Sequence, residues 1–406
     1  MRGRPPPAGP GAGGIATRRS WRGSRRRPSE PGTLGGSPIR GGRDRPRDTE
    51  AGVMDQVGTR GTAPAAPAAP AARRRRSAAV TVLAATAAAG FAVFAALRGL
   101  GLERGWPLVP ALAYTPYVLG AALLAATAAG LLRRWVPLAV LVAAAAVLAA
   151  AVVPRAIPFG ISGAGGPELR VMSLNALGGG AEVAEVVALV RDREVTVLAL
   201  QEVTPDLLEA LSEAGLDDLL PHTVDHSAAG VHGSSVHAAL PLTDLGDAAA
   251  GTGAFAMPRA GMEVPGYSFP VEVVSVHPLP PLAPGTMDGW RDGLRALPGP
   301  RDAEPAAADP GNRLHRPGLR ILAGDFNATL DHAELRRVLD AGYVSAATVH
   351  GRGLEPTWPT GGGLPGVTID HVLVDESMGV GAFEVVEVTG SDHRAVLAQV
   401  TLPEGR

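Results

Sequence analysis

Three long apolar stretches without an internal charge constrain this chain more than any other feature of its sequence. They cover Ala78–Leu97, Trp106–Leu132 and Trp135–Val153, and arginines flank each of them. Each is about as long as a helix that crosses the hydrocarbon core of a bilayer, which needs roughly 20 residues. Buried core helices of a soluble protein are the alternative, but uncharged runs bounded by arginine are typical of membrane spans. We therefore expect three transmembrane helices.

The arginines around these stretches also predict an orientation. Arg73–Arg76 and Arg133–Arg134 flank the ends that should stay in the cytoplasm, whereas the loop Arg98–Gly105 holds two arginines and one glutamate. Three crossings from a cytoplasmic N-terminus would place the C-terminal part outside the membrane. The first stretch is long and lacks a small-residue cleavage site, so we interpret it as an anchor and not as a removed signal peptide.

Charge divides the chain into unequal parts. Residues 1–166 hold 22 arginines and 6 acidic residues, whereas residues 167–406 hold 15 arginines and 33 acidic residues. We expect a disordered, Arg/Pro/Gly-rich cytoplasmic tail at 1–76, three transmembrane helices at 77–155 and a catalytic domain at 167–406. Met54 is an alternative start, because the residues before it look like translated upstream sequence. The absence of cysteine excludes disulfides and thiolate metal sites.

From Glu168 onward, short β-rich runs alternate with loops and a few amphipathic segments. Strands are predicted for Leu169–Leu174, Val195–Leu200, Val271–Val276, Leu319–Ala323, Val367–Val374, Phe383–Val388 and Ala395–Thr401. Helices are predicted for Ala181–Arg191, Pro205–Ala214 and His332–Leu339, with a short one near Trp290–Leu297. Because strands outnumber helices, we expect sheets that pack on each other with helices outside.

Polar residues follow the ends of these apolar strands. They are Asn175, Glu202, His277, Asp325, Asn327 and the pairs Asp370–His371 and Asp392–His393. Strand ends at one rim of a sheet are a common place to assemble a site. Each residue taken alone is a polar cap on a strand, but their joint recurrence favours a site.

Six motifs in this region resemble a known superfamily. They are LNAL (174–177), QE (201–202), SVHP (275–278), GDFN (324–327), IDHV (369–372) and SDHR (391–394). In this order they resemble the endonuclease/exonuclease/phosphatase superfamily over essentially all of residues 168–402. The resemblance implies an α/β fold, a four-layer sandwich of two packed mixed sheets flanked by helices, here preceded by the three transmembrane helices.

The resemblance further implies a metal-dependent phosphoric ester hydrolase. Asn175, Glu202 and Asp392 belong to the implied metal site, with Glu202 as the main carboxylate ligand. Mg²⁺ is the expected ion and Mn²⁺ the alternative, since hard cations prefer oxygen ligands and suit phosphate substrates. A zinc site built from His222, His226, His232 and His237 is less favoured, because these residues lack regular ligand spacing; we expect them to be mostly solvated loop residues.

Five further residues have implied catalytic roles. Asp325 orients or deprotonates the attacking water, and Asn327 and His277 contact the phosphate. His393 stabilises the charge that develops on the phosphoryl group, and Asp370 holds His393 in the required tautomer. General chemistry agrees, because phosphoryl transfer needs an activated nucleophile and hydrogen-bond donors around the phosphate oxygens.

The substrate follows less directly from the sequence. The acidic domain lacks a basic stripe for nucleic acid, and its anchor would keep the site near lipid head groups. We therefore expect the bilayer and a small or lipid-linked phosphate ester or pyrophosphate as partners, with nucleic acid less favoured. The layout is similar to membrane-bound superfamily members associated with glycopeptide resistance. An extracytoplasmic nuclease and a non-catalytic membrane scaffold remain as alternatives.

Overall fold

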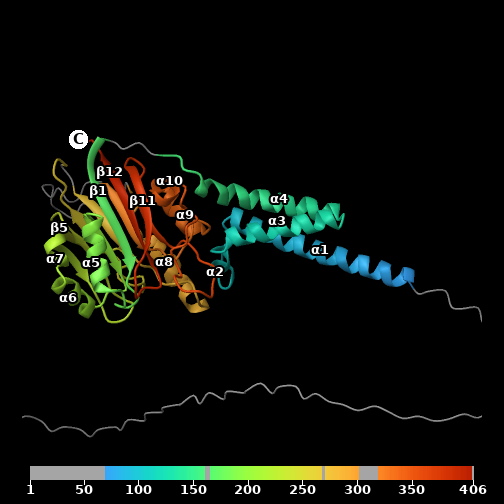
Figure 1. The fold of residues 1–406 in the computed structure, drawn as a ribbon, viewed down its shortest axis with the longest axis horizontal. Coiled ribbons are helices and arrows are strands. Elements are labelled where there is room, and N and C mark those ends of the chain that lie inside the picture. Colours follow the sequence, from blue (N-terminus) through green and yellow to red (C-terminus); the bar gives the residue numbers. More distant parts are fainter. Residues whose placement is uncertain (1–68, 161–164, 268–269, 301–318, 405–406) are drawn as a thin grey trace, which may run out of the picture. The chain divides into compact units, whose positions relative to one another are not determined.

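Two six-stranded mixed sheets pack face to face in the C-terminal part of the chain (Figure 1). The computed structural model describes residues 69–160, 165–267, 270–300 and 319–404. The first sheet has the strand order β11-β12-β1-β2-β4-β3. Its strands are β1 (Gly165–Asn175), β2 (Val197–Gln201), β3 (His222–His226), β4 (Ser234–Ala238), β11 (Gly379–Glu387) and β12 (Arg394–Pro403).

The second sheet has the strand order β5-β6-β7-β8-β10-β9. Its strands are β5 (Leu242–Asp247), β6 (Pro258–Met262), β7 (Val271–Val276), β8 (Arg320–Asp325), β9 (Tyr343–Ser345) and β10 (Asp370–Asp375). Each sheet has one parallel pair at its centre, β1 with β2 and β7 with β8, and its other pairs are antiparallel. Within each parallel pair, the carboxyl ends of the two strands therefore lie at the same edge of the sheet.

Alternation along the central strands explains the layers. In β2, Val197 and Ala199 belong to the core between the sheets, whereas Leu198 and Leu200 belong to the core under the helices. Successive side chains of a strand point to opposite faces, so a strand that is apolar on both faces must be covered on both. The continuous apolar runs therefore required the helices outside the sheets.

Helices cover the outer face of each sheet and complete four layers. On the first sheet lie α5 (Val183–Asp192), α6 (Pro205–Glu213) and α7 (Leu216–Leu219), and on the second lie α8 (Met287–Ala296) and α9 (Ala333–Asp340). The shorter helical elements are α10 (Ala346–Val349), η1 (Val153–Ala156) and η2 (Pro284–Thr286). The predicted α/β sandwich of two packed mixed sheets flanked by helices is confirmed.

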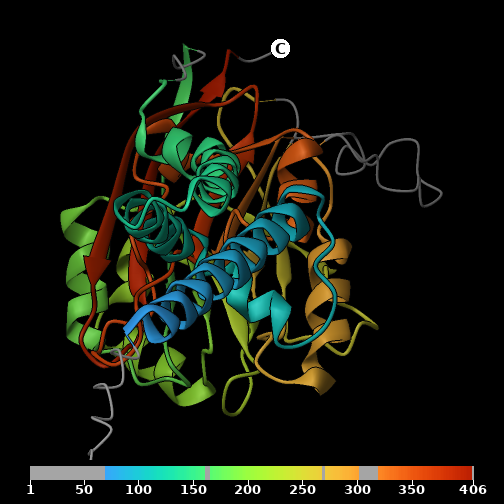
Figure 2. The same ribbon diagram turned by 90° about the vertical axis from the view of Figure 1, so that its right-hand side faces the viewer.

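Four helices precede the sheets, and Figure 2 shows the long ones lying beside one another. They are α1 (Ala69–Gly99), α2 (Leu108–Leu112), α3 (Thr115–Leu131) and α4 (Trp135–Val152). The prediction of three full-length transmembrane helices needs correction. Two helical segments, Arg74–Gly99 and Trp135–Ala156, are long and apolar enough to cross a membrane, whereas α3 has only 17 residues.

Proline explains why the middle stretch is shorter than expected. The apolar run Trp106–Leu132 is interrupted around Ala113 and Tyr114, and α3 begins with a proline in its first turn. Proline lacks the amide hydrogen of a helix interior but is well tolerated at a helix start. The run therefore folds as the short α2, a bend and α3.

The long helices keep most of their apolar surface uncovered. In the most apolar 18-residue stretch of Arg74–Gly99 only 11% is buried, and in that of Trp135–Ala156 only 33% is buried. Leu83 and Leu124, for example, are more than two-thirds exposed, at 71% and 74%. A helix that is apolar all round is normally buried in a large core or in a membrane. The described protein does not supply such a core around these helices.

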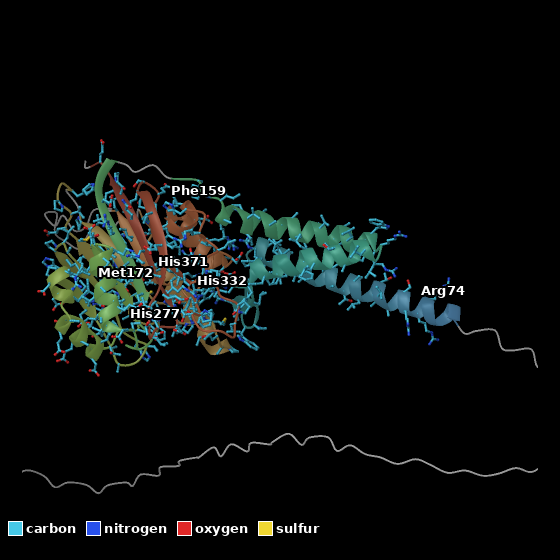
Figure 3. All side chains as sticks on the ribbon, viewed as in Figure 1. Arg74, Phe159, Met172, His277, His332 and His371 are labelled. Carbon is cyan, nitrogen blue, oxygen red and sulfur yellow. The ribbon has the colours of Figure 1, made fainter. Side chains whose placement is uncertain are left out.

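The two ends of the helical region differ in their partners. At one end, Arg134 Nη2 in the turn between α3 and α4 donates to the carbonyl oxygen and to Oγ of Ser77 in α1, at 3.2 and 2.9 Å. Figure 3 shows Arg74 at this end of α1, away from the sheets. At the other end, Arg98 and Arg155 both bond to Asp331, which follows β8.

The predicted N-terminal tail lies mainly outside the described residues. Residues 1–68, which include Met54, belong to the part that the structure does not describe, whereas α1 already begins at Ala69 within the predicted tail. The strands and helices of the second half cover the predicted catalytic region from Gly165 to Pro403.

Candidate active site

The parallel strands bring the first site residues together. Asn175 ends β1 and is paired with Gln201 at the end of β2, so Glu202 follows at the same edge. In the second sheet, β7 and β8 run in parallel, with Val276 opposite Gly324. His277 and Asp325 therefore extend from neighbouring strand ends. This is the arrangement expected from polar residues that follow apolar strands.

Asn175 connects the two sheets by hydrogen bonds to one carboxylate at the edge of each sheet. Its Nδ2 atom donates to Glu202 Oε1 and to Asp325 Oδ2, each at 3.2 Å, and its Oδ1 accepts the backbone amide of Leu177 at 3.0 Å. As placed, Asn175 orients both carboxylates with the amide nitrogen, which cannot ligate a cation. Its predicted contribution to a metal site stays a prediction.

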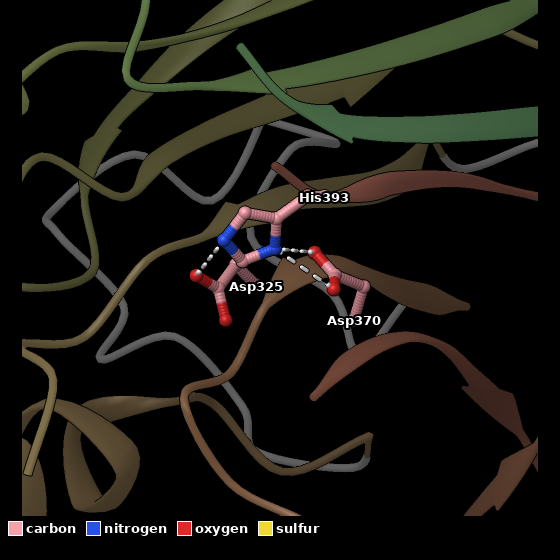
Figure 4. Close-up of side chains that lie close together, drawn as sticks. All are labelled: Asp325, Asp370 and His393. Carbon is pink, nitrogen blue, oxygen red and sulfur yellow. Dashed lines mark hydrogen bonds and ion pairs between the residues drawn. The ribbon is translucent and has the colours of Figure 1, made fainter. Parts of the chain in front are cut away.

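His393 lies between two buried aspartates, as Figure 4 shows. Its Nδ1 donates to Asp370 at 3.0 Å from Oδ2 and 3.1 Å from Oδ1, and its Nε2 lies 3.8 Å from Asp325 Oδ2. Antiparallel pairing of β10 with β8 places Asp370 directly opposite Asp325. The turn before His393 is tied to β1, because Ser391 Oγ donates to the Asn175 carbonyl at 2.7 Å.

Burial and mutual attraction shift the protonation of this group. Burial raises the pKa of Asp325 to about 7, although neighbouring His393 opposes the shift. Burial alone would lower the pKa of His393, but Asp370 and Asp325 together raise it to about 10. At neutral pH His393 is therefore a cation, and Asp325 is close to its midpoint. A positively charged donor and an ionisable acceptor thus face each other across 3.8 Å.

His277 has the opposite electrostatic character. It is 1% exposed, and burial, with a smaller effect of neighbouring His393, lowers its pKa to about 3. Its ring lies 4.7 Å from that of Phe255, and its Nε2 is 3.8 Å from Glu202 Oε1 and 3.9 Å from Asp325 Oδ2. His277 is therefore a neutral hydrogen-bonding group, whereas His393 is charged.

Asn327 and Glu202 both adopt left-handed backbone conformations. Their φ angles are +47° and +53°, a region that non-glycine residues seldom occupy. The Asn327 amide donates to Asp325 Oδ1 at 2.8 Å, and its Nδ2 donates to the Pro278 carbonyl at 3.0 Å. Local strain of this kind is often concentrated at functional sites, where the surrounding structure must enforce it.

Asp392 is positioned by the segment Pro356–Pro359. The indole Nε1 of Trp358 donates to Asp392 Oδ2 at 2.9 Å. Thr357 Oγ1 accepts the backbone amides of Ile369 and Asp370 at 3.0 and 3.1 Å. This segment therefore supports both the Asp392 carboxylate and the strand that carries Asp370.

The sequence itself matches the Endonuclease/Exonuclease/phosphatase family over residues 172–393. The chain belongs to this endonuclease/exonuclease/phosphatase family. The match includes all eight predicted site residues, from Asn175 to His393. No curated protein matches the chain.

Several solved structures are similar to this family member. An endonuclease/exonuclease/phosphatase from Beutenbergia cavernae DSM 12333 is 19% identical, with a TM-score of 0.43, over 58% of this chain and 72% of that chain. The 3′ phosphatase NExo from Neisseria, bound to a product DNA hairpin, is 19% identical, with a TM-score of 0.44, over 57% of this chain and 98% of the other. A humanized D. rerio TDP2 is 14% identical, with a TM-score of 0.44, over 58% and 99%.

Enzymes of the family generally depend on a divalent metal, and the site residues fit one. Glu202 Oε2 and Asp392 Oδ1 are buried oxygen atoms that accept no hydrogen bond from the residues that the structure describes. Burial raises the pKa of Glu202, and the nearby Asp392 adds to the shift. Buried carboxylate oxygens without donors are costly, and a hard cation would satisfy both.

A second group of ligand-type side chains is less suited to a metal. Atoms of Asp325, Asp370 and His393 lie within 4.8 Å of one another. However, His393 Nδ1 is engaged by Asp370, and the raised pKa of His393 keeps Nε2 protonated. A protonated imidazole nitrogen has no lone pair for a metal. We interpret this group as acid–base machinery.

The site opens into a cleft of about 340 Å³. Six of the eight predicted residues line it, namely Glu202, His277, Asp325, Asn327, Asp392 and His393. Asn175 and Asp370 lie behind them and are 0% and 1% exposed. The structure therefore brings all eight together, while their individual roles stay predictions.

Other residues of the cleft were missed in the sequence. Phe255 and Trp358 flank the two histidines. Pro110 comes from α2, and Ala113 and Tyr114 come from the bend between α2 and α3. Apolar residues in an apolar stretch carry no signal that distinguishes a cleft wall from a lipid-facing surface. Only the tertiary structure reveals that this bend reaches the site.

The expectation for the histidine cluster was wrong in part. His222 and His226 lie in β3 and His237 lies in β4, so three of the four belong to strands and not to a loop. His237 is 3% exposed, and burial lowers its pKa to about 4. Its ring bonds to Thr223 Oγ1 and Ser235 Oγ at 3.0 and 2.9 Å, which accounts for both nitrogens.

Proposed function

We propose that the protein is a membrane-anchored, divalent-metal-dependent phosphoesterase or pyrophosphate hydrolase. The observation that best supports this proposal is the position of the His393 imidazole. It bonds to Asp370 on one side and faces Asp325 on the other, at the floor of a cleft. A buried charged donor beside a carboxylate with a raised pKa suits acid–base chemistry at neutral pH.

In this proposal, Asp325 accepts a proton from the attacking water as the water oxygen bonds to phosphorus. Its pKa of about 7 matches that task at neutral pH. Cationic His393 donates from Nε2 to a phosphate oxygen, where negative charge increases during the reaction. Asp370 fixes the ring by occupying Nδ1. The bond to the leaving oxygen then breaks, and solvent protonates that oxygen.

Glu202 and Asp392 would hold the metal, Mg²⁺ in the first instance and Mn²⁺ as the alternative. A bound divalent cation would supply charge stabilisation for the phosphate and a template for its orientation. Trp358 positions one of these carboxylates and Asn175 the other. Neutral His277 and the backbone-constrained Asn327 remain as contacts for the phosphate.

The proposed location is the outer face of the cytoplasmic membrane. In support, Arg134 bonds to Ser77, so the arginine-rich ends of the helical region share one side. The opposite ends, marked by Arg98 and Arg155, contact the catalytic domain. Because arginine-rich ends are expected to stay in the cytoplasm, the N-terminus would be cytoplasmic and the catalytic domain outside.

The proposed substrate is a small or lipid-linked phosphate. Residues 167–406 have 33 acidic residues against 15 arginines. Proteins derive much of their non-specific affinity for nucleic acids from lysines and arginines that neutralise the phosphates. An acidic domain at a membrane surface is therefore better suited to a compact phosphate than to a polymer.

Hydrolysis by the full-length protein in detergent, measured as phosphate release or, for the diester and DNA, as cleavage of the ester bond, tests this function. The panel comprises a phosphomonoester, a phosphodiester, a pyrophosphate and plasmid DNA, each with Mg²⁺, with Mn²⁺ and with a chelator. We expect metal-dependent release from at least one small substrate and little cleavage of DNA. Hydrolysis of DNA alone would support the nuclease alternative, and no hydrolysis of any substrate would support the scaffold. A reporter fused after Arg406 that is active only outside the cytoplasm tests the orientation.

A further inference from the structure

Exposed hydrophobic side chains of the two-sheet region gather at a single place. Among the described residues of 165–404, the large exposed ones are Leu177, Val231, Leu282 and Leu364, at 45%, 38%, 65% and 57%. All four line the cleft that contains the candidate catalytic residues. Singly scattered hydrophobics are ordinary on protein surfaces. A group confined to one cleft marks a binding surface.

The membrane-side segment supplies another apolar wall of the same cleft. Pro110 of α2, and Ala113 and Tyr114 of the bend between α2 and α3, line it together with the polar floor residues His277 and Asp325. The volume of about 340 Å³ lies within the roughly 300–1,000 Å³ range of small-molecule sites. The cleft thus combines a floor of polar residues suited to a phosphate with apolar walls.

Contacts with the catalytic domain hold this wall in place. His332 Nε2 donates to the Val109 carbonyl at 2.8 Å, just before Pro110. Tyr117 Oη of α3 donates to the Gly366 carbonyl at 2.8 Å, two residues beyond Leu364, which also lines the cleft. The wall is therefore a fixed part of the site and not a passing linker.

We infer that the α2–α3 bend is a specificity-determining wall, and that the cleft takes an amphiphilic phosphoester whose apolar chain lies against Ala113, Tyr114, Leu282 and Leu364. This inference rests on the proposed phosphoesterase function. The phosphate sits on the polar floor, and the chain runs along the walls toward the ends of the membrane helices. The hydrophobic effect then contributes to binding through the area of the chain that leaves water.

Charge distinguishes this occupant from a nucleic acid. No arginine is among the described residues that line the cleft, whereas Glu202, Asp325 and Asp392 are. A polynucleotide would bring several phosphates to a cleft lined by three carboxylates and by no described arginine, which disfavours it. A single phosphate with an apolar chain brings one charged group, and its hydrocarbon chain lies against the apolar walls.

The test compares two esters that differ only in chain length. Full-length protein in detergent is assayed on the ethyl and octyl esters of phosphate, of pyrophosphate and of p-nitrophenyl phosphate, and on a single-stranded oligonucleotide. We expect kcat/KM for the octyl ester to exceed that for the ethyl ester by about tenfold or more in the reactive class, since several buried methylenes are each worth about 0.8 kcal/mol.

Two variants assign the preference to the walls. Ala113→Asp introduces a charge on the wall formed by the α2–α3 bend, and Leu282→Asp does so at another lining position, where the exposed loop tolerates polarity. Each should lower the octyl-to-ethyl ratio about tenfold. The matched control is Ala111→Asp, because Ala111 is exposed on α2 and does not line the cleft. It should leave the ratio unchanged.

The possible failures are distinguishable. No hydrolysis of any ester by the wild type overturns the proposed function itself. Hydrolysis with equal kcat/KM for ethyl and octyl esters overturns the inference and leaves the function standing. A chain-length preference that survives both Ala113→Asp and Leu282→Asp also overturns it, as does an oligonucleotide that is cleaved faster than either ester.

Discussion

The Nδ1 atom of His393 bonds to both carboxylate oxygens of Asp370, at 3.0 and 3.1 Å, although the two residues come from different sheets. His393 immediately precedes β12 of the first sheet, and Asp370 begins β10 of the second. A contact between sheets is maintained only by the packed core between them. The pair therefore links the integrity of the sandwich to the protonation and orientation of one imidazole.

The first prediction is that His393 and Asp370 act as a unit. His393→Ala should reduce turnover about a hundredfold or more, the usual scale for loss of one transition-state donor. Asp370→Asn should cost less, because the ring remains while its tautomer is no longer fixed. The double variant should be barely worse than His393→Ala, since residues that act together are non-additive. Single losses that simply multiply in the double variant would contradict a joint role.

The second prediction concerns Glu202 and the metal. Glu202→Ala should abolish metal-dependent turnover and weaken Mg²⁺ binding to the full-length protein, measured by titration calorimetry. The metal-free fold should be retained, because burial raises the pKa of Glu202 and its Oε2 lacks a hydrogen-bond donor. Wild-type activity and affinity in Glu202→Ala would remove it from the metal site. Glu384→Gln, on an exposed surface pair with Arg193, is the control.

Much of this site was predictable because the ends of buried strands are visible in the sequence as apolar runs followed by polar residues. Apolar runs that stop at Asn175, Gln201, Val276 and Asp325 have the length of buried strands, and the polar residues follow at the point where the sheet ends. The four-layer order also follows, since strands that are apolar on both faces need cover on both. Locally encoded features were therefore recoverable.

Features that depend on distant partners were not predictable. Asp331 sits in a loop with no distinguishing pattern, yet Arg98 and Arg155 reach it from 233 and 176 residues away. The edge strand β5 and its neighbour β6 are short and mixed in polarity, so their periodicity is too weak to detect. Ala113 is one alanine among many in an apolar stretch, and its position in the cleft is a tertiary property.

The third prediction uses the raised pKa of Asp325. Its value is about 7 in the folded protein against 3.8 ordinarily, so the folded state binds the proton more tightly. Stability from this group is present below pH 3.8 and is lost as the pH rises through 7. Asp325 alone should therefore make the metal-free protein less stable at pH 7.5 than at pH 5. The buried His277 and His237, with pKa values of about 3 and 4, act in the opposite direction up to about pH 6.5, so the pH dependence due to Asp325 is the difference between wild type and Asp325→Asn.

Asp325→Asn should reduce this dependence by removing the titrating group, with an effect on the order of a few kcal/mol at pH 7.5. Thermal unfolding in detergent with a chelator measures it. Asp288→Asn is the control, because the Asp288 side chain is 90% exposed. An unfolding temperature whose pH dependence is the same in wild type and Asp325→Asn would show that Asp325 is not buried in its neutral form.

The last prediction concerns the connection between the N-terminal apolar helices and the two-sheet domain. Asp331 is 0% exposed and accepts hydrogen bonds from Arg98 at 3.0 Å and from Arg155 at 2.7 and 2.8 Å. Removal of one partner from a buried ion pair typically costs about 3–5 kcal/mol, because it leaves an uncompensated charge. Asp331→Ala should therefore lower the unfolding temperature of the full-length protein by several degrees.

The exposed pair of Arg193 with Glu384 provides the contrast, since such surface pairs contribute only about 0–1 kcal/mol. Glu384→Ala should change the unfolding temperature little. Proteolysis should respond in parallel: in Asp331→Ala, the bend that carries Tyr114 should become cleavable, because Asp331 orders the loop from which His332 holds Val109. Equal, small effects of Asp331→Ala and Glu384→Ala would show that the buried arginines find other partners and that the helices are not fastened to the site at this point.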